Sequence, residues 1–426
     1  MTDYSSDADR RSRWVPRERP EWVTTLNTEL GHLDMAGCVP LDEASLLNSA
    51  MARTGLDDFD DDFNDGAWRE PFRVLIKALE EEAELNPLGR LMARNDILNA
   101  LCARLQVAQV FKEHPEINDE EIVSPLLIIG QGRCGSTALH QLMSADPDNR
   151  VLRTWESIAP CPPPETATYE TDPRIAALDP MVTMVNRIVP EVTGMQVFAS
   201  WEAQENILLH SITFRSPAWL SAVVGQVPSY MAYMFGQDPT INYREEKRLL
   251  QLLQWRKPGK RWVWKSPYAT LELPAVLQVY PDTNLVYMHR DPVKALASLV
   301  DLVGTMNWAR SDHPLKDGAF EQHTNAQMVN GMLCMPIQWI TGGVVPKDQL
   351  MNVQFPEFRD DPLGVVERIY ATFDMELTDA GRAAMAEYQA STPFRRHSYK
   401  LGSDQAIAYE RAAFAPYQSY FGVENE

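Results

Sequence analysis

Residues 124–145 read SPLLIIGQGRCGSTALHQLMSA and fall into three segments of different character. SPLLIIG is a short apolar run between proline and glycine, which is typical of a buried strand in a parallel sheet. QGRCGST is a tight loop of small residues, and ALHQLMSA has the pattern of a helix that ends before Asp146-Pro147. A strand, a glycine-rich loop and a helix in this order predict an anion-binding loop.

The loop at 130–137 keeps the spacing of the phosphate-binding motif G-x-x-x-x-G-K-[ST], but it lacks the lysine. Small residues allow successive backbone N–H groups to converge on one anion, and the following helix adds the positive end of its dipole. Ser136 stands where nucleotide triphosphatases have lysine, and the cation of the loop is Arg133. A donor with one phosphate bearing the transferable group therefore fits better than a triphosphate. The alternative is a glycine-rich turn without a ligand.

Three further apolar runs have the same strand character. RWVWK at 261–265, NLVYM at 284–288 and QLMNVQF at 349–355 each precede a helical pattern. Strands that alternate with helices predict an α/β fold, in which a P-loop-type parallel sheet is flanked by helices.

The rest of the chain is predicted to surround this sheet. We expect a flexible N-terminal arm at 1–20, a helical N-terminal region at 21–121 packed on the core, and the P-loop domain at 122–426. Within that domain, residues 170–255 are interpreted as a helical insertion at the acceptor site, rich in aromatic side chains and methionine. Such stripes are more often core than pocket. If part of this one lines a pocket, an apolar or aromatic small-molecule acceptor is favoured.

Basic residues stand at the carboxyl ends of the predicted strands, where ligands of open parallel sheets bind. Lys265 ends the second strand, Arg290 follows the third, and Ser298 lies about two helical turns further on. Each has an ordinary surface role as its alternative. Together with Arg133 they place three cationic centres along one edge of the sheet, which predicts a ligand with at least two separated anionic groups.

The overall composition narrows the possible partners. A formal net charge of −20 argues against nucleic acid and anionic membranes, because such a surface repels them. The five cysteines form no C-x-x-C pair, which argues against structural zinc and a disulfide framework. The N-terminal sequence is polar and no run of about 18 apolar residues occurs, so neither a signal peptide nor a transmembrane helix is expected. A cytoplasmic enzyme is the simplest interpretation.

These motifs, in this order, resemble those of sulfotransferases that use 3'-phosphoadenosine 5'-phosphosulfate (PAPS), and in particular the bacterial branch with a PRSGTT-like loop. GQGRCGSTALHQLMSADPDNRVLRTWE resembles the 5'-phosphosulfate loop, VYMHRDPVKALASLVDL the 3'-phosphate signature, and WVWKSP the strand that ends in Lys-Ser-Pro. FRRHSY and FAPYQSYFGV are similar to the closing segment of this branch. The resemblance covers roughly residues 40–423.

The resemblance implies a role for each matching residue. Arg133 would contact the sulfuryl group and the bridging oxygen, Lys265 would lie near the transferring group, and Arg290 and Ser298 would bind the 3'-phosphate. The nucleotide-binding residues would be Gly132, Arg133, Cys134, Gly135, Ser136, Thr137, Arg290, Ser298 and, in a late loop that closes over the nucleotide, Arg395 and Arg396. The implied activity is transfer of a sulfuryl group from PAPS to a hydroxyl or amine of a small-molecule acceptor, with no metal required.

The base that accepts the proton of the attacking group has several candidates. Many relatives place a histidine two residues after Lys-Ser-Pro, and this chain has no histidine there. Glu156 is the first candidate, because the resemblance implies a catalytic glutamate in the stretch after the P-loop helix, and the adjacent tryptophan could raise the pKa of its carboxyl group. His140, one turn into the helix after the loop, is the second, and Glu202 and Glu205 are further candidates. The predicted catalytic residues are thus Arg133, Glu156, Lys265 and His140.

Other functions remain as alternatives to a sulfotransferase. A P-loop small-molecule kinase needs ATP, Mg²⁺ and the motif lysine that the sequence lacks. A non-catalytic nucleotide-binding protein would hold the nucleotide without turnover. A purely structural helical protein leaves the three cationic strand ends unexplained. A homo-oligomer is left open.

Overall fold

The computed structural model describes residues 14–216, 219, 226–313, 325–392 and 399–426. Within these residues five parallel strands form one sheet in the order β2-β3-β1-β4-β5. The strands are β1 (Leu126–Gly130), β2 (Asn149–Arg150), β3 (Arg261–Lys265), β4 (Asn284–His289) and β5 (Leu350–Gln354). The predicted α/β fold with a parallel sheet is confirmed, and the short β2 is an addition to it.

β1 is the central strand and is buried on both faces. Leu127 and Ile129 contribute to one hydrophobic cluster, while Leu126 and Ile128 contribute to another. This division follows from the geometry of a strand, in which successive side chains point to opposite faces. Helices that cover both faces account for the continuous apolar run in the sequence.

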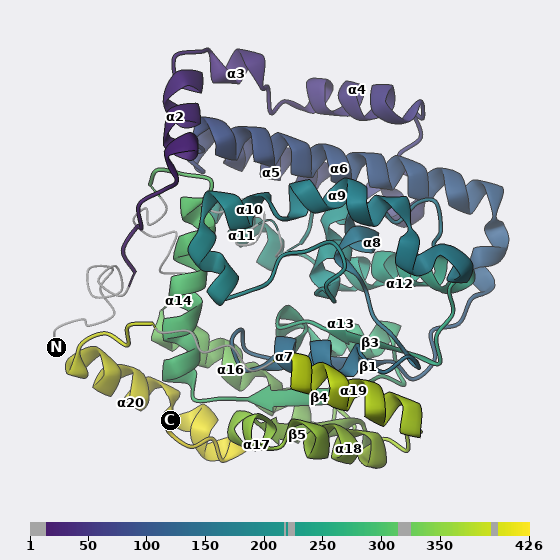
Figure 1. Ribbon diagram of the computed structural model, residues 1–426, viewed down its shortest axis with the longest axis vertical. Helices are drawn as coiled ribbons and strands as arrows, with labels where there is room; N and C mark the ends of the chain where they lie inside the picture. The colour runs from purple at the N-terminus through teal and green to yellow at the C-terminus, as the bar shows by residue number, and fades with distance from the viewer. Residues whose placement is uncertain (1–13, 217–218, 220–225, 314–324, 393–398) are drawn as a thin grey trace.

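Two groups of helices sandwich the sheet (Figure 1). The cluster that contains Ile128 is completed by α7 (Ser136–Met143), α18 (Pro362–Thr372) and α19 (Asp379–Ser391). The cluster that contains Ile129 is completed by α6 (Pro87–Glu113), α12 (Thr240–Trp255) and α13 (Leu273–Val279).

The N-terminal helices pack on the sheet through α6. They are α2 (Glu21–Leu30), α3 (Met35–Cys38), α4 (Glu43–Thr54) and α5 (Arg69–Glu81). A second core joins Leu46 of α4, Leu75 of α5 and Ile97 of α6 to Tyr230 of α11 (Pro228–Phe235). The N-terminal region therefore shares its core with the middle of the chain. The domain boundaries stay a prediction.

The middle segment is less regular than the helical insertion that we expected, and residues 195–205 contain no helix. Its helices are α8 (Thr154–Ile158), α9 (Pro173–Val182), α10 (Met184–Ile188) and the 3-10 turns η3 (Thr166–Thr171), η4 (Pro190–Gly194) and η5 (Asn206–Thr213). The other helices are α14 (Pro292–Trp308), α16 (Ala326–Thr341), α17 (Phe355–Asp360), α20 (Asp404–Phe421), η1 (Phe63–Gly66), η2 (Pro115–Asp119), η7 (Tyr268–Leu271) and η8 (Lys347–Gln349). In the described part of the chain, none of the helices has the length and apolar character needed to cross a bilayer.

The carboxyl ends of β1, β3 and β4 lie side by side. Ile128 pairs with Lys265, and Gly130 pairs with Met288. The loop after β1, the end of β3 and the turn after β4 therefore meet at one edge of the sheet. At that turn, the Asp291 side chain accepts the N–H of Val293 at 2.9 Å and caps α14.

Candidate active site

The loop between β1 and α7 depends on glycine at two positions. Gly135 has φ +94°, and a Cβ there would lie 2.6 Å from the Phe355 ring. Gly130 has φ +139°, and a Cβ there would lie 2.5 Å from the carbonyl oxygen of Met288. Arg133 has φ +73° although it carries a side chain, a conformation that costs on the order of 1–3 kcal/mol. The loop is thus held in a curled shape that the neighbouring residues enforce.

The start of α7 is open to a ligand. No side chain caps this helix, which begins at Ser136. Ser136 and Thr137 line a cavity together with Gly132 and Arg133. The free N–H groups of a first helical turn and the helix dipole favour an anion at this position. The Cys134 side chain instead packs in the hydrophobic core, so only its backbone is available to a ligand.

Arg133, Ser298 and Arg290 lie together, as the sequence predicted for a ligand with two anionic ends. Arg133 Nε donates to Ser298 Oγ at 3.0 Å, and Arg290 Nη1 donates to the Arg133 carbonyl oxygen at 3.0 Å. The Arg290 guanidinium lies 4.2 Å from the centre of the Phe355 ring. Burial, with a contribution from the charge of Arg290, lowers the pKa of Arg133. An anion near these two cations would relieve both effects.

Arg290 already has a carboxylate partner that the sequence did not reveal. Its Nε donates to Glu426 Oε1 at 2.9 Å, and its Nη2 contacts Glu426 Oε2 at 3.2 Å and Tyr399 Oη at 3.4 Å. A carboxylate therefore lies on the cation that we predicted to bind the 3'-phosphate.

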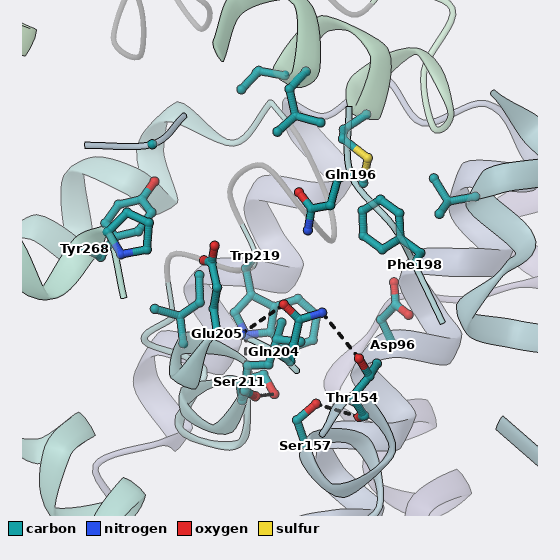
Figure 2. A pocket seen from close by; sticks show the side chains of 18 of the residues that line it. Asp96, Thr154, Ser157, Gln196, Phe198, Gln204, Glu205, Ser211, Trp219 and Tyr268 are labelled. Atoms are coloured by element: carbon teal, nitrogen blue, oxygen red, sulfur yellow. Dashed lines mark hydrogen bonds between the residues drawn. The ribbon is translucent and has the colours of Figure 1, made fainter. Parts of the chain in front are cut away.

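Lys265 connects the loop to the middle segment. Its Nζ donates to Thr137 Oγ1 at 2.9 Å and to Glu205 Oε1 at 2.5 Å. The Lys265 side chain is 4% exposed and that of Glu205 is 21% exposed. Figure 2 shows the Glu205 carboxylate extending into the open centre of the cavity, with Tyr268 nearby. One buried ammonium thus contacts both the anion-binding loop and the cavity.

The cavity has a volume of about 980 Å³ and is mainly apolar. Its walls come from α6, α9, α10, η5, α11, α14 and α16, with the loop residues 131–133 at one side. Apolar side chains that line it include Met92, Met181, Phe198, Trp219, Met231 and Leu302. The cavity thus joins the anion-binding loop to an apolar space large enough for a sizeable organic molecule.

Glu156, the first candidate for the base, is engaged elsewhere. Its carboxylate accepts hydrogen bonds from both Nη atoms of Arg150, from the Tyr169 hydroxyl at 3.0 Å and from the Arg153 backbone N–H at 3.0 Å. The Glu156 side chain is fully buried and does not belong to the cavity wall. Its contacts are those of a structural ion pair, and its role as a base stays a prediction.

The other predicted residues have varied positions. His140 is fully buried on α7 next to β3, where its Nε2 lies 3.2 Å from the Val263 carbonyl oxygen. Desolvation, reinforced by the charge of Lys265, lowers the pKa of His140 to about 3. Glu202 accepts a hydrogen bond from Gln141 at 2.9 Å, and neither it nor His140 lines the cavity. The predictions for Arg395 and Arg396 lie outside the described residues.

The arrangement is that of an enzyme that transfers a group from an anionic donor. The loop after β1 leads into an uncapped helix, cations stand at the strand ends, and a mainly apolar cavity adjoins them. No group of three or more His, Cys, Asp or Glu side chains that could hold a metal ion occurs among the residues the structure describes.

Comparison with known proteins identifies the family. The model of the sulfotransferase family matches residues 125–379. The structure is similar to sulfotransferase STF9 from Mycobacterium avium, with a TM-score of 0.78 and 29% identity over 90% of this chain and 97% of that one. It is also similar to sulfotransferase STF1 from Mycobacterium tuberculosis H37Rv, with a TM-score of 0.73 and 30% identity over 88% of this chain and 98% of that one. No curated protein matches significantly.

The chain belongs to the sulfotransferase family. It is accordingly a transferase whose family uses PAPS as the sulfuryl donor, and the sulfotransferase activity predicted from the motifs is confirmed. The alternatives of a kinase and of a non-catalytic nucleotide-binding protein are not favoured.

Proposed function

We propose that this sulfotransferase acts on a hydroxyl group carried by a large, mainly apolar acceptor. The observation that carries this proposal is the cavity of about 980 Å³, whose apolar walls meet the anion-binding loop. Apolar walls favour an apolar ligand because its binding removes hydrocarbon surface from water. A sugar would leave most of its hydroxyl groups without partners in such a space, at a cost of about 1–3 kcal/mol for each.

The donor fits the basic edge of the sheet. We infer that the start of α7, with Ser136 and Thr137, binds the 5'-phosphate, and that Arg290 and Ser298 bind the 3'-phosphate. The uncapped helix and the paired cations support this assignment. For the 3'-phosphate to bind, Arg290 has to release the carboxylate of Glu426.

PAPS supplies an activated sulfuryl group, and the protein stabilises the charge that develops when this group leaves the nucleotide. We assign that task to Arg133, which belongs to the loop, and to Lys265, which contacts the loop at Thr137; both side chains line the cavity. Both act where little water can screen them, which strengthens their effect. Removal of one such stabilising side chain typically lowers the rate on the order of 10²–10³-fold. The donor carries no polyphosphate chain, so the proposal needs no metal ion.

Binding of the donor is tested by thermal unfolding with PAP, the desulfated nucleotide, with ATP and Mg²⁺, and with NAD. We expect PAP to raise the melting temperature and the other two to have little effect. The variant Arg290→Ala should lose most of the PAP-dependent shift. Stabilisation by ATP and Mg²⁺ without stabilisation by PAP would contradict the proposed donor.

The acceptor class is tested with isotopically labelled PAPS. The enzyme is incubated with a lipid extract and, separately, with a polar metabolite extract, and sulfated products are identified by mass spectrometry. We expect labelled product in the lipid extract, and its loss in the variant Arg133→Ala. Product confined to the polar extract would overturn the apolar acceptor.

A further inference from the structure

Two side chains with carboxyl groups line the cavity among the residues that the structure describes, Glu205 and Asp96. They point into it from different sides in Figure 2. Asp96 lies on α6 and pairs with Arg310 at 2.9 Å, and burial raises the pKa of its carboxyl group. Glu205 lies beside Lys265, which contacts the anion-binding loop. Of the two, Glu205 is the carboxylate next to the donor site.

The described cavity wall contains no histidine, and its one tyrosine is Tyr268. Desolvation, with a smaller contribution from Glu205, raises the pKa of Tyr268 far above neutral, so its hydroxyl stays protonated. A group that accepts a proton at neutral pH must be uncharged histidine, a carboxylate or a comparable base. Among the described residues near the loop, this requirement leaves Glu205.

We propose that Glu205 is the catalytic base of the sulfuryl transfer. This inference rests on the proposed function, since it assumes an acceptor hydroxyl in the cavity. The hydroxyl oxygen forms a new bond to sulfur, and its proton passes to the Glu205 carboxylate. The bond between sulfur and the bridging oxygen breaks, and its electron pair remains on the 5'-phosphate of PAP. No other reactant is needed.

The position of Lys265 couples the two halves of this step. Before reaction, its ammonium group is shared between Glu205 Oε1 at 2.5 Å and Thr137 Oγ1 at 2.9 Å. When Glu205 gains the proton, its negative charge disappears and it attracts Lys265 less strongly. At the same moment, negative charge grows on the phosphate at the loop. The positive charge of Lys265 therefore becomes available where the leaving group needs it.

The competing explanation is structural, in which Glu205 only neutralises a buried lysine. The two explanations differ in measurable ways. A neutralising carboxylate affects stability and nucleotide binding but has no direct role in proton transfer. A base affects turnover, and its importance falls when the acceptor gives up its proton easily.

The experiment measures release of PAP from PAPS by chromatography for the wild type, Glu205→Gln and Glu202→Gln. The acceptors are 4-methylphenol, the more acidic 4-nitrophenol, and water alone. Glu202→Gln makes the same chemical change three residues away, outside the cavity. For Glu205→Gln we expect a loss on the order of 10²–10⁴-fold with 4-methylphenol, a smaller loss with 4-nitrophenol, and unchanged PAP affinity by calorimetry. Glu202→Gln should behave like the wild type.

A second variant addresses the structural explanation directly. Glu205→Ala opens space for a small carboxylate, so added formate should restore part of its turnover if the missing function is that of a base. Equal turnover of Glu205→Gln and wild type, or an equal loss with both phenols and no rescue by formate, overturns the proposal. A wild-type enzyme that binds PAP but transfers to no acceptor contradicts the proposed function instead, and the two failures are therefore distinguishable.

Discussion

Arg290 and Glu426 form an ion pair with two contacts, 2.9 Å between Nε and Oε1 and 3.2 Å between Nη2 and Oε2. Both side chains are partly exposed to solvent, 17% and 19%. Because we propose that Arg290 binds the 3'-phosphate, the Glu426 carboxylate and that phosphate compete for the same guanidinium group. The protein thus supplies a weak competitor of its own donor.

Removal of this competitor should tighten nucleotide binding. Such a pair is worth about 0.5–1 kcal/mol, so we expect Glu426→Gln to lower the Kd for PAP about two- to fivefold, measured by calorimetry. The exposed Glu424 provides the matched control, since Glu424→Gln removes the same charge two residues away. An equal effect of both variants would show that overall charge, and not the ion pair, is responsible.

The ion pair between Arg150 and Glu156 should contribute mainly to stability. Both side chains are almost fully buried, 3% and 0% exposed. Glu156→Gln leaves Arg150 with an uncompensated buried charge, so the free energy of unfolding should fall by about 3–5 kcal/mol. Urea unfolding measures this change.

Glu165→Gln is the control, because the Glu165–Arg256 pair is about half exposed, and its loss should cost less than about 1 kcal/mol. If the Glu156→Gln protein had normal stability but no turnover, that result would support a role of Glu156 as the catalytic base.

Two buried histidines should make the protein less stable in mild acid. Desolvation lowers the pKa of His140 to about 3 and that of His289 to about 4. Below about pH 6.5 the unfolded chain binds protons at these side chains while the folded protein does not. The free energy of unfolding therefore falls as the pH is lowered through this range, by up to about 1.4 kcal/mol per pH unit for each histidine.

This pH effect is measured by urea unfolding at several pH values between about 7.5 and 5, because histidine in an unfolded chain titrates in this range. His289→Gln keeps a polar side chain beside Tyr417 and Asn352. This variant should lose the contribution of one histidine to the dependence of the unfolding free energy on pH. Identical slopes for the variant and the wild type would show that His289 does not cause the effect.

The shape of the anion-binding loop should depend on Gly135. Gly135→Ala places a methyl group against Phe355 and requires a positive φ, so we expect a loss of at least about 1 kcal/mol in stability and weaker PAP binding. Gly331→Ala is the comparison, because a Cβ there meets nothing within 4 Å and lies inside α16. That variant should be about 0.5–1 kcal/mol more stable than the wild type. Thermal unfolding with and without PAP measures both variants.

The sheet could be predicted because each of its main strands is a continuous apolar run with a helix behind it. The runs at 261–265 and 284–288 correspond to β3 and β4 within one residue. β2 could not be predicted, because two residues are too few to show a periodic pattern. Residues 195–205 lie within the stretch 170–255 that was expected to be helical. Their backbone groups instead bond partly to the segment after α7, as between the Gln204 N–H and the Leu152 carbonyl oxygen.

The sequence could predict that Arg133, Lys265 and Arg290 lie at one edge of the sheet, because each residue follows or ends a strand and the carboxyl ends of parallel strands lie side by side. The acidic partners of Lys265 and Arg290 could not be predicted, because Glu205 and Glu426 lie 60 and 136 residues away in the sequence. Glu156 is paired by Arg150 only six residues before it, yet nothing in the sequence marks that arginine as buried. Glu205 was one of several carboxylates near tryptophan, and its contact with Lys265 singles it out.

The helix α6 belongs at once to the second core, to the packing against the sheet and to the wall of the cavity. Its inward positions, such as Met92 and Asn99, come from a different part of the chain than the nucleotide loop. Substitutions on α6 can therefore change which acceptor the cavity binds, while the residues that bind the nucleotide stay the same. The same arrangement limits how far such changes can go, since every substitution on α6 also has to preserve the support that it gives to the sheet.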